Sequence, residues 1–589
     1  MIATFFMLLL IIDWSLYFRH AGHFFQGDSV FLLSNRATSI ASFVARLTEH
    51  EGSGFYRPLS HIESILYPVF GLHPIAYHVA VYALFVIDTI AVYVLVRAIT
   101  HRSMAAALAT LFFSIHTVNA YTTYDVGFAP ELLYAFFYTA AALAFLRYIE
   151  TGRKPAQYAS AVCFILSLLA KESAITLPVT LIVLYIVMAS RPEPLQVRFI
   201  RALRSTLPHM LILIAYIAFA IGYLHIMDIS VTKLLHPSKN ADGGNYVVAL
   251  NGTILENADL ALIWAFNIPR GYWGQWQDMT PVRMEYLKIF RLLVVVLSLV
   301  LLMTSERKMI LIGAAWFAIT ILPALPLLNH LLPYYLFLPI VGLSLVVGVV
   351  FTWTYDVLRQ RQPIVAAMAI FIVFGCMLYV TSRSIRGDIR DNRLLGGSAD
   401  LAFRSLTDLK RLYPEIPAKT TIYFNDAEEP LSWEQNNGAL IRMAYNDAKI
   451  GTLYASQGDA VFSAGNGNTI VLRIHNKHLV DETSQYRANP ERFVPYIDST
   501  LFKLDLHPAN VDRGSRYSLT ISGLHDAPVR IAYSLNDGPT EAFTARVDAQ
   551  GQATFEVSSV TPKGVYRFLG FNISGHSEWI RTDKIVTVH

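Results

Sequence analysis

Apolar residues form long runs along the first two thirds of the chain. A helix needs about 20 mostly apolar residues to cross roughly 30 Å of hydrocarbon with its backbone polar groups satisfied. Eleven runs come near that length, at residues 2–18, 74–98, 103–120, 128–149, 157–171, 173–189, 206–226, 285–303, 309–327, 332–353 and 363–381. We therefore predict an α-helical polytopic membrane protein with about 11 transmembrane helices.

Two places in this pattern need a specific interpretation. The first run, Ile2 to Phe18, has no basic segment and no small-residue cleavage site, which favours a retained span over a removed signal peptide. The fifth and sixth runs meet at "AKES". One long broken helix is an alternative there, but the lengths suit a pair of spans.

The pattern changes near residue 418 to short alternating runs broken by Gly, Asn, Asp and Pro. Examples are "TTIYFND", "YSLTISGL", "VRIAYSLNDG", "QATFEVSSV" and "VYRFLGFNI". Short strands at intervals of about 8 to 12 residues are typical of a β-sandwich. We predict a membrane domain over residues 1–382, a small mixed α/β region over 383–499 and an immunoglobulin-like sandwich over 500–589.

Basic residues mark alternate connections between the apolar runs. These residues are Arg97 and Arg102; Arg147, Arg153 and Lys154; Arg191, Arg198, Arg201 and Arg204; Arg307 and Lys308; Arg359 and Arg361. The positive-inside rule makes these connections cytoplasmic. The long segments 19–73 and 227–284 and the C-terminal region are then extracytoplasmic, which in a bacterial inner membrane means periplasmic.

Composition supports the membrane assignment and excludes some function classes. Hydrophobic residues make up 54% of the 589 residues and charged residues 15%, and the mean hydropathy is +0.42. The net charge of +4 is small, and no cluster of Lys and Arg indicates nucleic-acid binding. Cys163 and Cys376 both lie in apolar runs, so the polar C-terminal region contains no disulfide.

Ionisable residues gather near the predicted outer ends of the runs. Such groups at membrane depth usually face a cavity or a partner, so they indicate where a site lies. The group comprises Asp28, Arg57, His116, Asp125, Glu131, Lys171, Glu172 and His330. Asp13 and Asp88 lie nearer mid-span or the cytoplasmic end, and we interpret them as structural.

Each of these residues also has a structural interpretation. Asp28 in "GDSVF" suits a helix N-cap, which by spacing alone is the better interpretation. Arg57 is either an interfacial anchor or a phosphate ligand. Lys171 and Glu172 are either a neutralised pair or a phosphate contact and the carboxylate that holds it, and these two alternatives are nearly balanced.

Other outer residues carry weaker signals. His116 and His330 are single histidines near helix ends, which are commonly satisfied by backbone groups. Arg270 lies in "NIPRGYWGQWQDMTP", which suits an aromatic belt or a lipid-headgroup contact. The spacing contains no specific metal-ligand set or nucleophile triad, and we predict neither a metal nor a cofactor.

The order and the residues of five motifs resemble those of a known family. "GDSVFLLSN", "YRPLS" with "GLHPIAYHV", "FSIHTVNAYTTYDVGFAPELL", "LSLLAKESAI" and "PYYLFLPIVG" follow one another in residues 1–350. They resemble membrane glycosyltransferases of the GT-C fold, most closely the transmembrane O-mannosyltransferases with tetratricopeptide repeats and their bacterial relatives. The C-terminal region departs from that family, because it lacks the repeats.

The resemblance implies roles for individual residues. Asp28 matches the second member of the family's aspartate pair, and Gly27 replaces the first. Glu131 matches an acidic residue before "LL". His116 matches the histidine of the family's His-Pro motif, in which Thr117 replaces the proline. Tyr335 lies in the segment that matches "RYLYLP", in which Tyr334 replaces the arginine.

What the resemblance implies is an inverting transfer of a sugar from a polyprenyl-phosphate carrier to a glycan, protein or lipid acceptor on the outer face. Asp28 is then the expected base, and Glu131 orients the acceptor or supports Asp28. Arg57 and Lys171 are expected to stabilise the leaving phosphate. The alternatives are a transporter or flippase of lipid-linked glycans and a non-catalytic membrane scaffold.

Overall fold

A computed structural model describes most of the chain. The described residues are 2–18, 22–34, 41, 56–189, 193–226, 248–267, 281–328, 330–360, 362–391, 397–427, 429–459, 468–489, 493, 496–497, 503–507, 510–512, 516–522, 527–536, 540–548, 550, 552–556, 563–573 and 579–588. They form two compact units. The first contains the apolar helices up to Gly397, and the second contains Phe24–Ser34 and the chain from Ser398 onwards.

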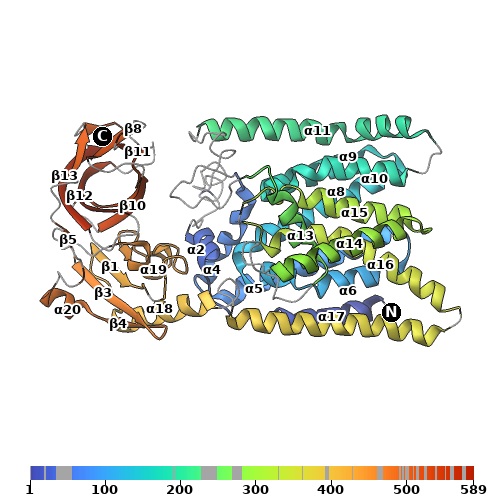
Figure 1. Cartoon of the computed structure of the whole chain (residues 1–589), viewed down its shortest axis with the longest axis horizontal. Coiled ribbons are helices and arrows are strands. Elements are labelled where there is room, and N and C mark those ends of the chain that lie inside the picture. The colour runs from blue at the N-terminus through green and yellow to red at the C-terminus, as the bar shows by residue number, and fades with distance from the viewer. Residues whose placement is uncertain are drawn as a thin grey trace. The chain divides into compact units, whose positions relative to one another are not determined.

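A helix lies at each of the eleven predicted apolar runs. These helices are α1 (Ile2–Leu16), α5 (Pro74–Thr100), α6 (Ser103–Ser114) with α7 (Val118–Tyr124), α8 (Ala129–Thr151), α9 (Lys154–Ala170), α10 (Leu177–Met188), α11 (Leu195–Ile226), α14 (Pro281–Leu302), α15 (Arg307–Ile321), α16 (Pro339–Leu358) and α17 (Pro363–Asp391). Figure 1 shows most of them running side by side. By length and composition, five described helices, or six with the bent pair α6 and α7, are long and apolar enough to cross a membrane. The total of eleven spans therefore stays a prediction.

Shorter elements lie between the long helices of the first unit. They are η2 (Pro58–Leu66), α4 (Tyr67–Phe70), η3 (Val126–Phe128), η4 (Glu172–Thr176), α13 (Thr253–Ala265) and η7 (Pro333–Leu336). The 3₁₀-helix η2 is nine residues long and leads directly into α4.

The bend between α6 and α7 has a hydrogen-bonding cause. The two helices differ in direction by 63°. At the break, the Asn119 side-chain amide donates to the carbonyls of Phe113 (2.6 Å) and Ser114 (3.0 Å). The Phe113 carbonyl also accepts from the His116 backbone N–H (3.3 Å), and the Ser114 carbonyl also accepts from the Tyr17 hydroxyl (2.8 Å). These groups at the end of α6 are therefore satisfied by partners outside the helix.

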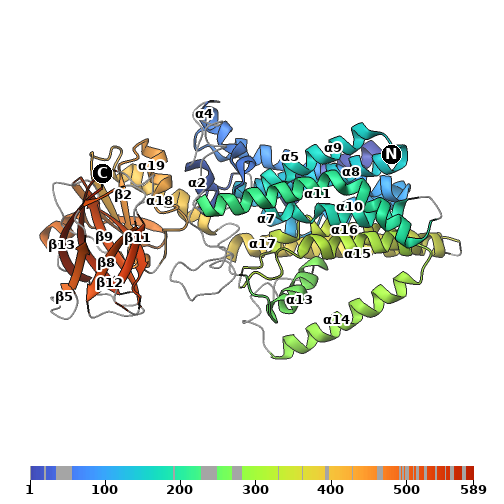
Figure 2. The same cartoon turned by 90° about the horizontal axis from the view of Figure 1, so that it is seen from above.

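Close helix packing in this unit depends on small residues. A Cβ placed on Gly342 of α16 would lie 2.5 Å from the carbonyl oxygen of Gly313 in α15, and the reverse is also true. Such small residues let backbones approach closely in apolar surroundings. In contrast, Figure 2 shows α14 diverging from α15 and α16.

Three of the connections predicted to be cytoplasmic meet at one end of the bundle. Arg102, between α5 and α6, pairs with Glu306 before α15 (3.2 Å) and with Asp356 near the end of α16 (3.9 Å). The spatial grouping of these connections agrees with their assignment to a single side.

The second unit begins with a small α/β layer. Its sheet has the order β2–β1–β3–β4, with β1 (Thr420–Asn425) parallel to both β2 (Gly451–Tyr454) and β3 (Asn468–His475), and β4 (His478–Asp481) antiparallel to β3. Helices α18 (Ser398–Leu412), α19 (Ala439–Tyr445) and α20 (Thr483–Ala488) accompany it. Leu401 and Leu409 of α18 pack with Ile422 and Phe424 of β1 in one core.

The rest of the second unit is strand-rich, as the alternating pattern predicts. One sheet has the order β10–β9–β12–β13–β5, with β7 beside β13, and the other has the order β11–β8–β6. The strands are β5 (Tyr496–Ile497), β6 (Lys503–His507), β7 (Asn510–Val511), β8 (Arg516–Ser522), β9 (Pro528–Leu535), β10 (Thr540–Arg546), β11 (Gln552–Glu556), β12 (Gly564–Ile573) and β13 (Trp579–Val588). Residues of both sheets share one core, for example Ile521 with Ile531 and Phe568.

Helix α2 (Gly27–Ser34) also belongs to the second unit. Phe24 packs edge-on against Phe403 of α18, with ring centroids 5.4 Å apart. Gly27 lies directly against the Trp433 ring, where a larger residue would clash. These contacts attach the segment that carries Asp28 to the α/β layer.

Candidate functional site

Two ion pairs come together where α8 and α9 meet the 3₁₀-helix η4. Arg57, which precedes η2, donates from Nε and Nη2 to the two carboxylate oxygens of Glu172, at 2.7 and 2.6 Å. This fork geometry is the strongest form of an Arg–carboxylate contact. The Arg57 side chain is 19% exposed and that of Glu172 30% exposed. Solvent or a ligand can therefore reach this pair.

The second pair is more deeply buried. The Lys171 ammonium donates to the Glu131 carboxylate, and the two side chains are only 5% and 7% exposed. Lys171 ends α9 with an extended backbone (φ −158°, ψ 135°), which directs the chain into η4. Glu131 lies in the first turn of α8, directly after Pro130, where a carboxylate is favoured by the helix dipole.

The four charges form one electrostatic group. Arg57 and Glu172 each interact electrostatically with both Glu131 and Lys171. Two positive and two negative side chains give the group no net formal charge. We call Arg57, Glu131, Lys171 and Glu172 the charge cluster.

Aromatic rings cover the cationic side of the charge cluster. The Lys171 ammonium lies 4.5 Å from the Tyr335 ring centroid and 5.5 Å from that of Tyr334. Both tyrosines belong to η7, and the His330 ring lies 6.1 Å from that of Tyr335. Burial, with the positive charge of Lys171 as a second cause, lowers the pKa of His330. His330 is therefore neutral at pH 7.

Two other predicted site residues make local contacts. His116 Nε2 lies 3.1 Å from the Ala265 carbonyl of α13, and its Nδ1 accepts from the Val118 backbone N–H (3.2 Å). Asp125 caps η3, because its carboxylate accepts from the Gly127 N–H at 2.8 Å. Both side chains are buried, and these bonds fix the turns before and after α7.

Asp28 lies in the second unit, in the first turn of α2, and its side chain is exposed. A carboxylate in this position interacts favourably with the positive end of the helix dipole. Helix α2 begins at Gly27, so Asp28 is inside the helix rather than at its N-cap. Arg270 lies outside the described residues, and its predicted role stays a prediction.

The two mid-span aspartates differ in their surroundings. Asp13 accepts a hydrogen bond from the Ser114 hydroxyl, which links α1 to α6. Asp88 is buried in α5. Neither residue belongs to the charge cluster, and their structural role stays a prediction.

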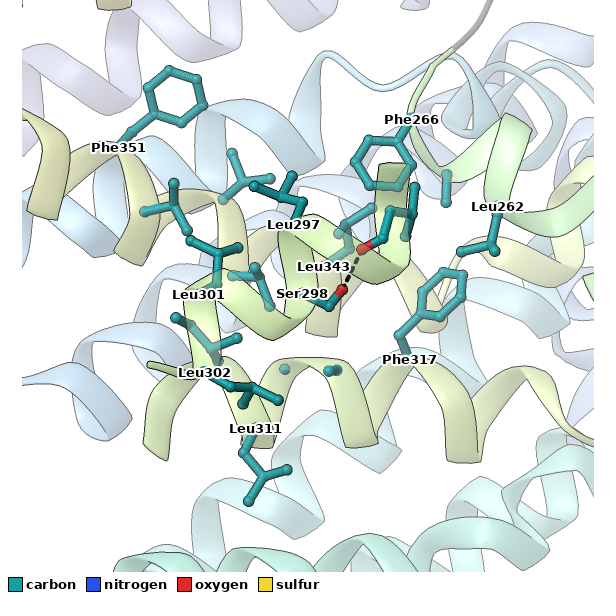
Figure 3. Close-up of a pocket in the computed structure, with 18 residues that line it drawn as sticks. Leu262, Phe266, Leu297, Ser298, Leu301, Leu302, Leu311, Phe317, Leu343 and Phe351 are labelled. Carbon is teal, nitrogen blue, oxygen red and sulfur yellow. Dashed lines mark hydrogen bonds between the residues drawn. The ribbon is translucent and has the colours of Figure 1, made fainter. Parts of the chain in front are cut away.

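An apolar cavity of about 330 Å³ lies between α13, α14, α15 and α16. Figure 3 shows side chains from these helices lining it, including Phe266, Leu301, Phe317 and Phe351. Ser298 is the one polar side chain among the lining residues, and its hydroxyl donates to the Val294 carbonyl (2.7 Å). The sequence did not reveal this cavity, because most of its residues are ordinary members of apolar runs and the others, Leu262, Ala265 and Phe266, lie between two runs.

Metal binding was not predicted, and the described part of the chain contains no group of three or more His, Cys, Asp or Glu side chains placed to hold a metal ion. The charge cluster has only two carboxylates, and each already contacts a cation. Its chemistry suits contact with an anion or a hydroxyl group.

Comparisons with known proteins give similarities at the level of structure. No protein-family model matches the chain, and no curated protein matches it in sequence. The crystal structure of ArnT from Cupriavidus metallidurans bound to undecaprenyl phosphate is 12% identical, with a TM-score of 0.45, over 86% of this chain and 95% of that chain. The apo oligosaccharyltransferase of Archaeoglobus fulgidus is 10% identical, with a TM-score of 0.46, over 100% of this chain and 98% of that chain.

A third similar structure is the archaeal oligosaccharyltransferase AglB from the same organism, in complex with an inhibitory peptide and a dolichol-phosphate. It is 10% identical, with a TM-score of 0.42, over 100% of this chain and 97% of that chain. All three TM-scores are below 0.5, so the function is argued below from this chain's own residues.

Proposed function

We propose that the protein is an inverting membrane glycosyltransferase that moves a sugar from a polyprenyl-phosphate carrier to an acceptor on the extracytoplasmic face. The observation that carries this proposal is the charge cluster. Its four ionisable side chains lie within a unit made mainly of apolar helices. The order of the five sequence motifs, which include Arg57, Glu131 and Lys171, supports the same assignment.

A purely structural explanation of the charge cluster is physically weak. Burying ions is costly, and apolar residues of similar volume stabilise a protein at least as well as a buried ion pair does. Ionisable groups at membrane depth are therefore usually functional. Two cations beside the bond that breaks suit a reaction in which negative charge develops on a phosphate.

The proposed roles follow from exposure and geometry. Arg57 is the more exposed of the two cations, and its planar guanidinium suits phosphate oxygens. Glu172 fixes the orientation of Arg57 through two hydrogen bonds. Lys171 adds positive charge from a buried position, and Glu131 holds it there. Glu131 is thus a positioning residue in this scheme.

The chemical step requires one base. The acceptor hydroxyl oxygen forms a bond to the anomeric carbon, while the bond from that carbon to the phosphate oxygen breaks and its electron pair stays on the phosphate. The hydroxyl proton passes to a carboxylate, which we assign to Asp28 on the basis of the motif that it shares with the resembled family. The polyprenyl phosphate leaves as a stable anion, so the scheme includes no metal or cofactor.

The apolar cavity suits the lipid part of this donor. Its lining is apolar apart from Ser298, and a hydrocarbon chain is the ligand that such surroundings favour. We assign the cavity to part of the isoprenoid chain of the carrier.

The test uses the full-length protein in phospholipid nanodiscs, with polyprenyl-phosphate hexoses and pentoses labelled in the sugar and a membrane extract as the acceptor source. We expect time-dependent release of polyprenyl phosphate and transfer of label to a non-donor fraction. Arg57→Ala should lower this transfer at least tenfold. Arg102→Ala is the matched control, because Arg102 is also ion-paired but lies among the basic connections.

A transporter or flippase is the remaining alternative, and it predicts a different result. Such a protein moves the intact carrier across the bilayer and leaves the bond between sugar and phosphate unbroken. Movement of label between leaflets without release of polyprenyl phosphate would contradict the transferase proposal. If the label neither moves between leaflets nor leaves the carrier, the result favours the non-catalytic scaffold.

A further inference from the structure

A polar cavity of about 430 Å³ lies in the second unit, between the α/β layer and strands β9 and β10 of the sandwich. Most of its lining residues have polar side chains, among them Asn437, Arg442, Gln457, Asp459, Arg530 and Glu541. This cavity differs in character from the apolar cavity of the first unit. Its chemistry is independent of the charge cluster.

Arg530 of β9 organises one wall of this cavity. Its Nε donates to the Asp459 carboxylate, and its Nη2 donates to Gln457 Oε1 at 2.8 Å. Its Nη1 reaches the Thr544 hydroxyl of β10 at 3.2 Å. The guanidinium therefore joins the α/β layer to the sandwich and fixes the side chains around it.

Asp459 is held from a second direction as well. Its Oδ2 accepts from the Tyr454 backbone N–H at 2.9 Å, and its side chain is only 2% exposed. A buried carboxylate with both oxygens engaged has a defined orientation. This wall is therefore ordered without a ligand, as binding sites require for specificity.

Another part of the lining is built from left-handed backbone. Asn436 (φ 44°), Asn437 (φ 48°) and Gly438 (φ 80°) are consecutive residues in the left-handed region. A Cβ on Gly438 would clash with the Thr452 hydroxyl. Left-handed residues other than glycine carry strain, and such strain is concentrated at functional sites.

This strained turn presents Asn437 to the cavity. The Asn437 carbonyl accepts from Arg442 Nη2 (2.8 Å) and from the Thr452 hydroxyl (3.1 Å). Its side-chain oxygen accepts from Gln457 Nε2 at 2.7 Å. A network of amides, guanidinium groups and carboxylates thus runs around the cavity.

The charges of the lining decide between ligand classes. Two arginines and two carboxylates sum to zero. An anion would be repelled by the negative charges of Asp459 and Glu541, and a cation would be repelled by the positive charges of Arg442 and Arg530. A neutral ligand with many hydroxyl groups meets donors and acceptors on every side, because each hydroxyl both donates and accepts.

We propose that this cavity is a binding site for a neutral saccharide. The volume is in the range of small-ligand sites. The proposal does not depend on the proposed transferase activity, because a saccharide-binding unit occurs equally well on a transporter or a scaffold.

The test is saturation-transfer difference NMR on the full-length protein in phospholipid nanodiscs, which avoid alkyl-glycoside detergents that would occupy the cavity. The probes are mannobiose, cellobiose, maltose, lactose and chitobiose, with inorganic phosphate as a competitor. We expect saturation transfer to at least one disaccharide and no displacement of it by phosphate.

Two matched variants distinguish binding in this cavity from binding elsewhere on the surface. Ala448 is an exposed lining residue, so Ala448→Trp fills the cavity without disturbing the core. We expect it to lower the transfer at least fivefold. Ala418 is an exposed residue before β1 that does not line the cavity, and Ala418→Trp should retain the wild-type signal.

A third variant tests the polar chemistry with little change in shape. Glu541 is exposed at the cavity, and Glu541→Gln should weaken disaccharide binding at least threefold while the thermal unfolding temperature is unchanged. The proposal is overturned if no disaccharide in the panel receives saturation, if Ala448→Trp and Ala418→Trp behave alike, or if phosphate displaces the sugar.

Discussion

Lys171 and Glu131 form an ion pair between the end of α9 and the start of α8, and each side chain is at least nine-tenths buried. Removal of one partner leaves the other as an uncompensated buried charge, which destabilises a protein by about 3–5 kcal/mol. We expect Lys171→Met and Glu131→Gln each to lower the thermal unfolding temperature markedly, and the double variant to lose less than the sum of the two. Thermal denaturation in a double-mutant cycle measures this coupling.

Arg147 and Glu150 provide the control for this cycle. They pair at 3.6 Å on the exposed surface of α8, where the side chains are 65% and 45% exposed. Exposed pairs of this kind contribute about 0–1 kcal/mol. Equal coupling energies for the two pairs would show that burial has no effect on the Lys171–Glu131 interaction.

Arg57 contacts Glu172 through two nitrogens, which predicts that a positive charge at this position is not sufficient for normal binding of the donor. Arg57→Lys keeps the positive charge but loses the fork of N–H donors. Charge-assisted hydrogen bonds contribute about 1.5–3 kcal/mol, so we expect the KM for the polyprenyl-phosphate donor to rise by about 10- to 100-fold. Steady-state kinetics in nanodiscs measure this change.

Arg291 offers a matched comparison for Arg57→Lys. It contacts Asp259 through Nη1 alone, at 3.1 and 3.4 Å, which a lysine can reproduce. Arg291→Lys should therefore leave the donor KM unchanged. A normal KM in Arg57→Lys would remove Arg57 from the proposed phosphate site.

Asp28 is the residue to which we assign the base, and its exposure makes the assignment testable without loss of folding. Asp28→Asn removes the proton acceptor but keeps the size of the side chain. General-base catalysis contributes about 10²- to 10⁴-fold, so kcat should fall by at least 10²-fold. The unfolding temperature should change little, and Asp28→Glu should restore part of the activity. Full activity in Asp28→Asn would eliminate Asp28 as the base.

The apolar cavity predicts that donor use depends on chain length. Ala314 of α15 lines the cavity, and Ala318 lies one turn further along the same helix, outside the lining. Both are exposed, so Ala314→Trp and Ala318→Trp make equal changes to similar surfaces. We expect only Ala314→Trp to raise the KM for a long-chain donor, and neither variant to change the KM for a farnesyl-phosphate sugar. Identical effects in both variants would show that the cavity does not bind the isoprenoid chain of the carrier.

Periodicity predicted where helices occur because the apolar runs and their breaks are local properties of the chain. Every predicted run coincides with a helix, and the change of pattern near residue 418 marks the start of strand β1. The same pattern did not determine how many helices are long enough to span. The positions of the basic residues also predicted which connections lie together. Arg102 agrees with this prediction, because its partners Glu306 and Asp356 lie at two other basic connections.

Contacts between distant residues were less predictable. The sequence suggested a pairing of Lys171 with its neighbour Glu172, but Lys171 pairs with Glu131, and Glu172 pairs with Arg57, 115 residues away. Adjacent residues at a helix end point in different directions, and only the packing of α8, η2 and η4 determines which charge each one meets. The polar cavity of the second unit likewise depends on strands from separate parts of the chain.

The facing glycines of α15 and α16 provide a last prediction, which concerns the stability of the first unit. A Cβ on Gly342 would lie 2.5 Å from the Gly313 carbonyl oxygen and 2.9 Å from the Phe317 nitrogen. These are backbone atoms, so the helices must separate, and overpacking of this kind costs about 1–3 kcal/mol. Gly375 of α17 has open space around the same position, and alanine there gains about 1 kcal/mol of helix propensity. Gly342→Ala should therefore lower the unfolding temperature and Gly375→Ala should maintain or raise it, whereas a loss of the same size in both variants would mean that α15 and α16 do not pack this closely.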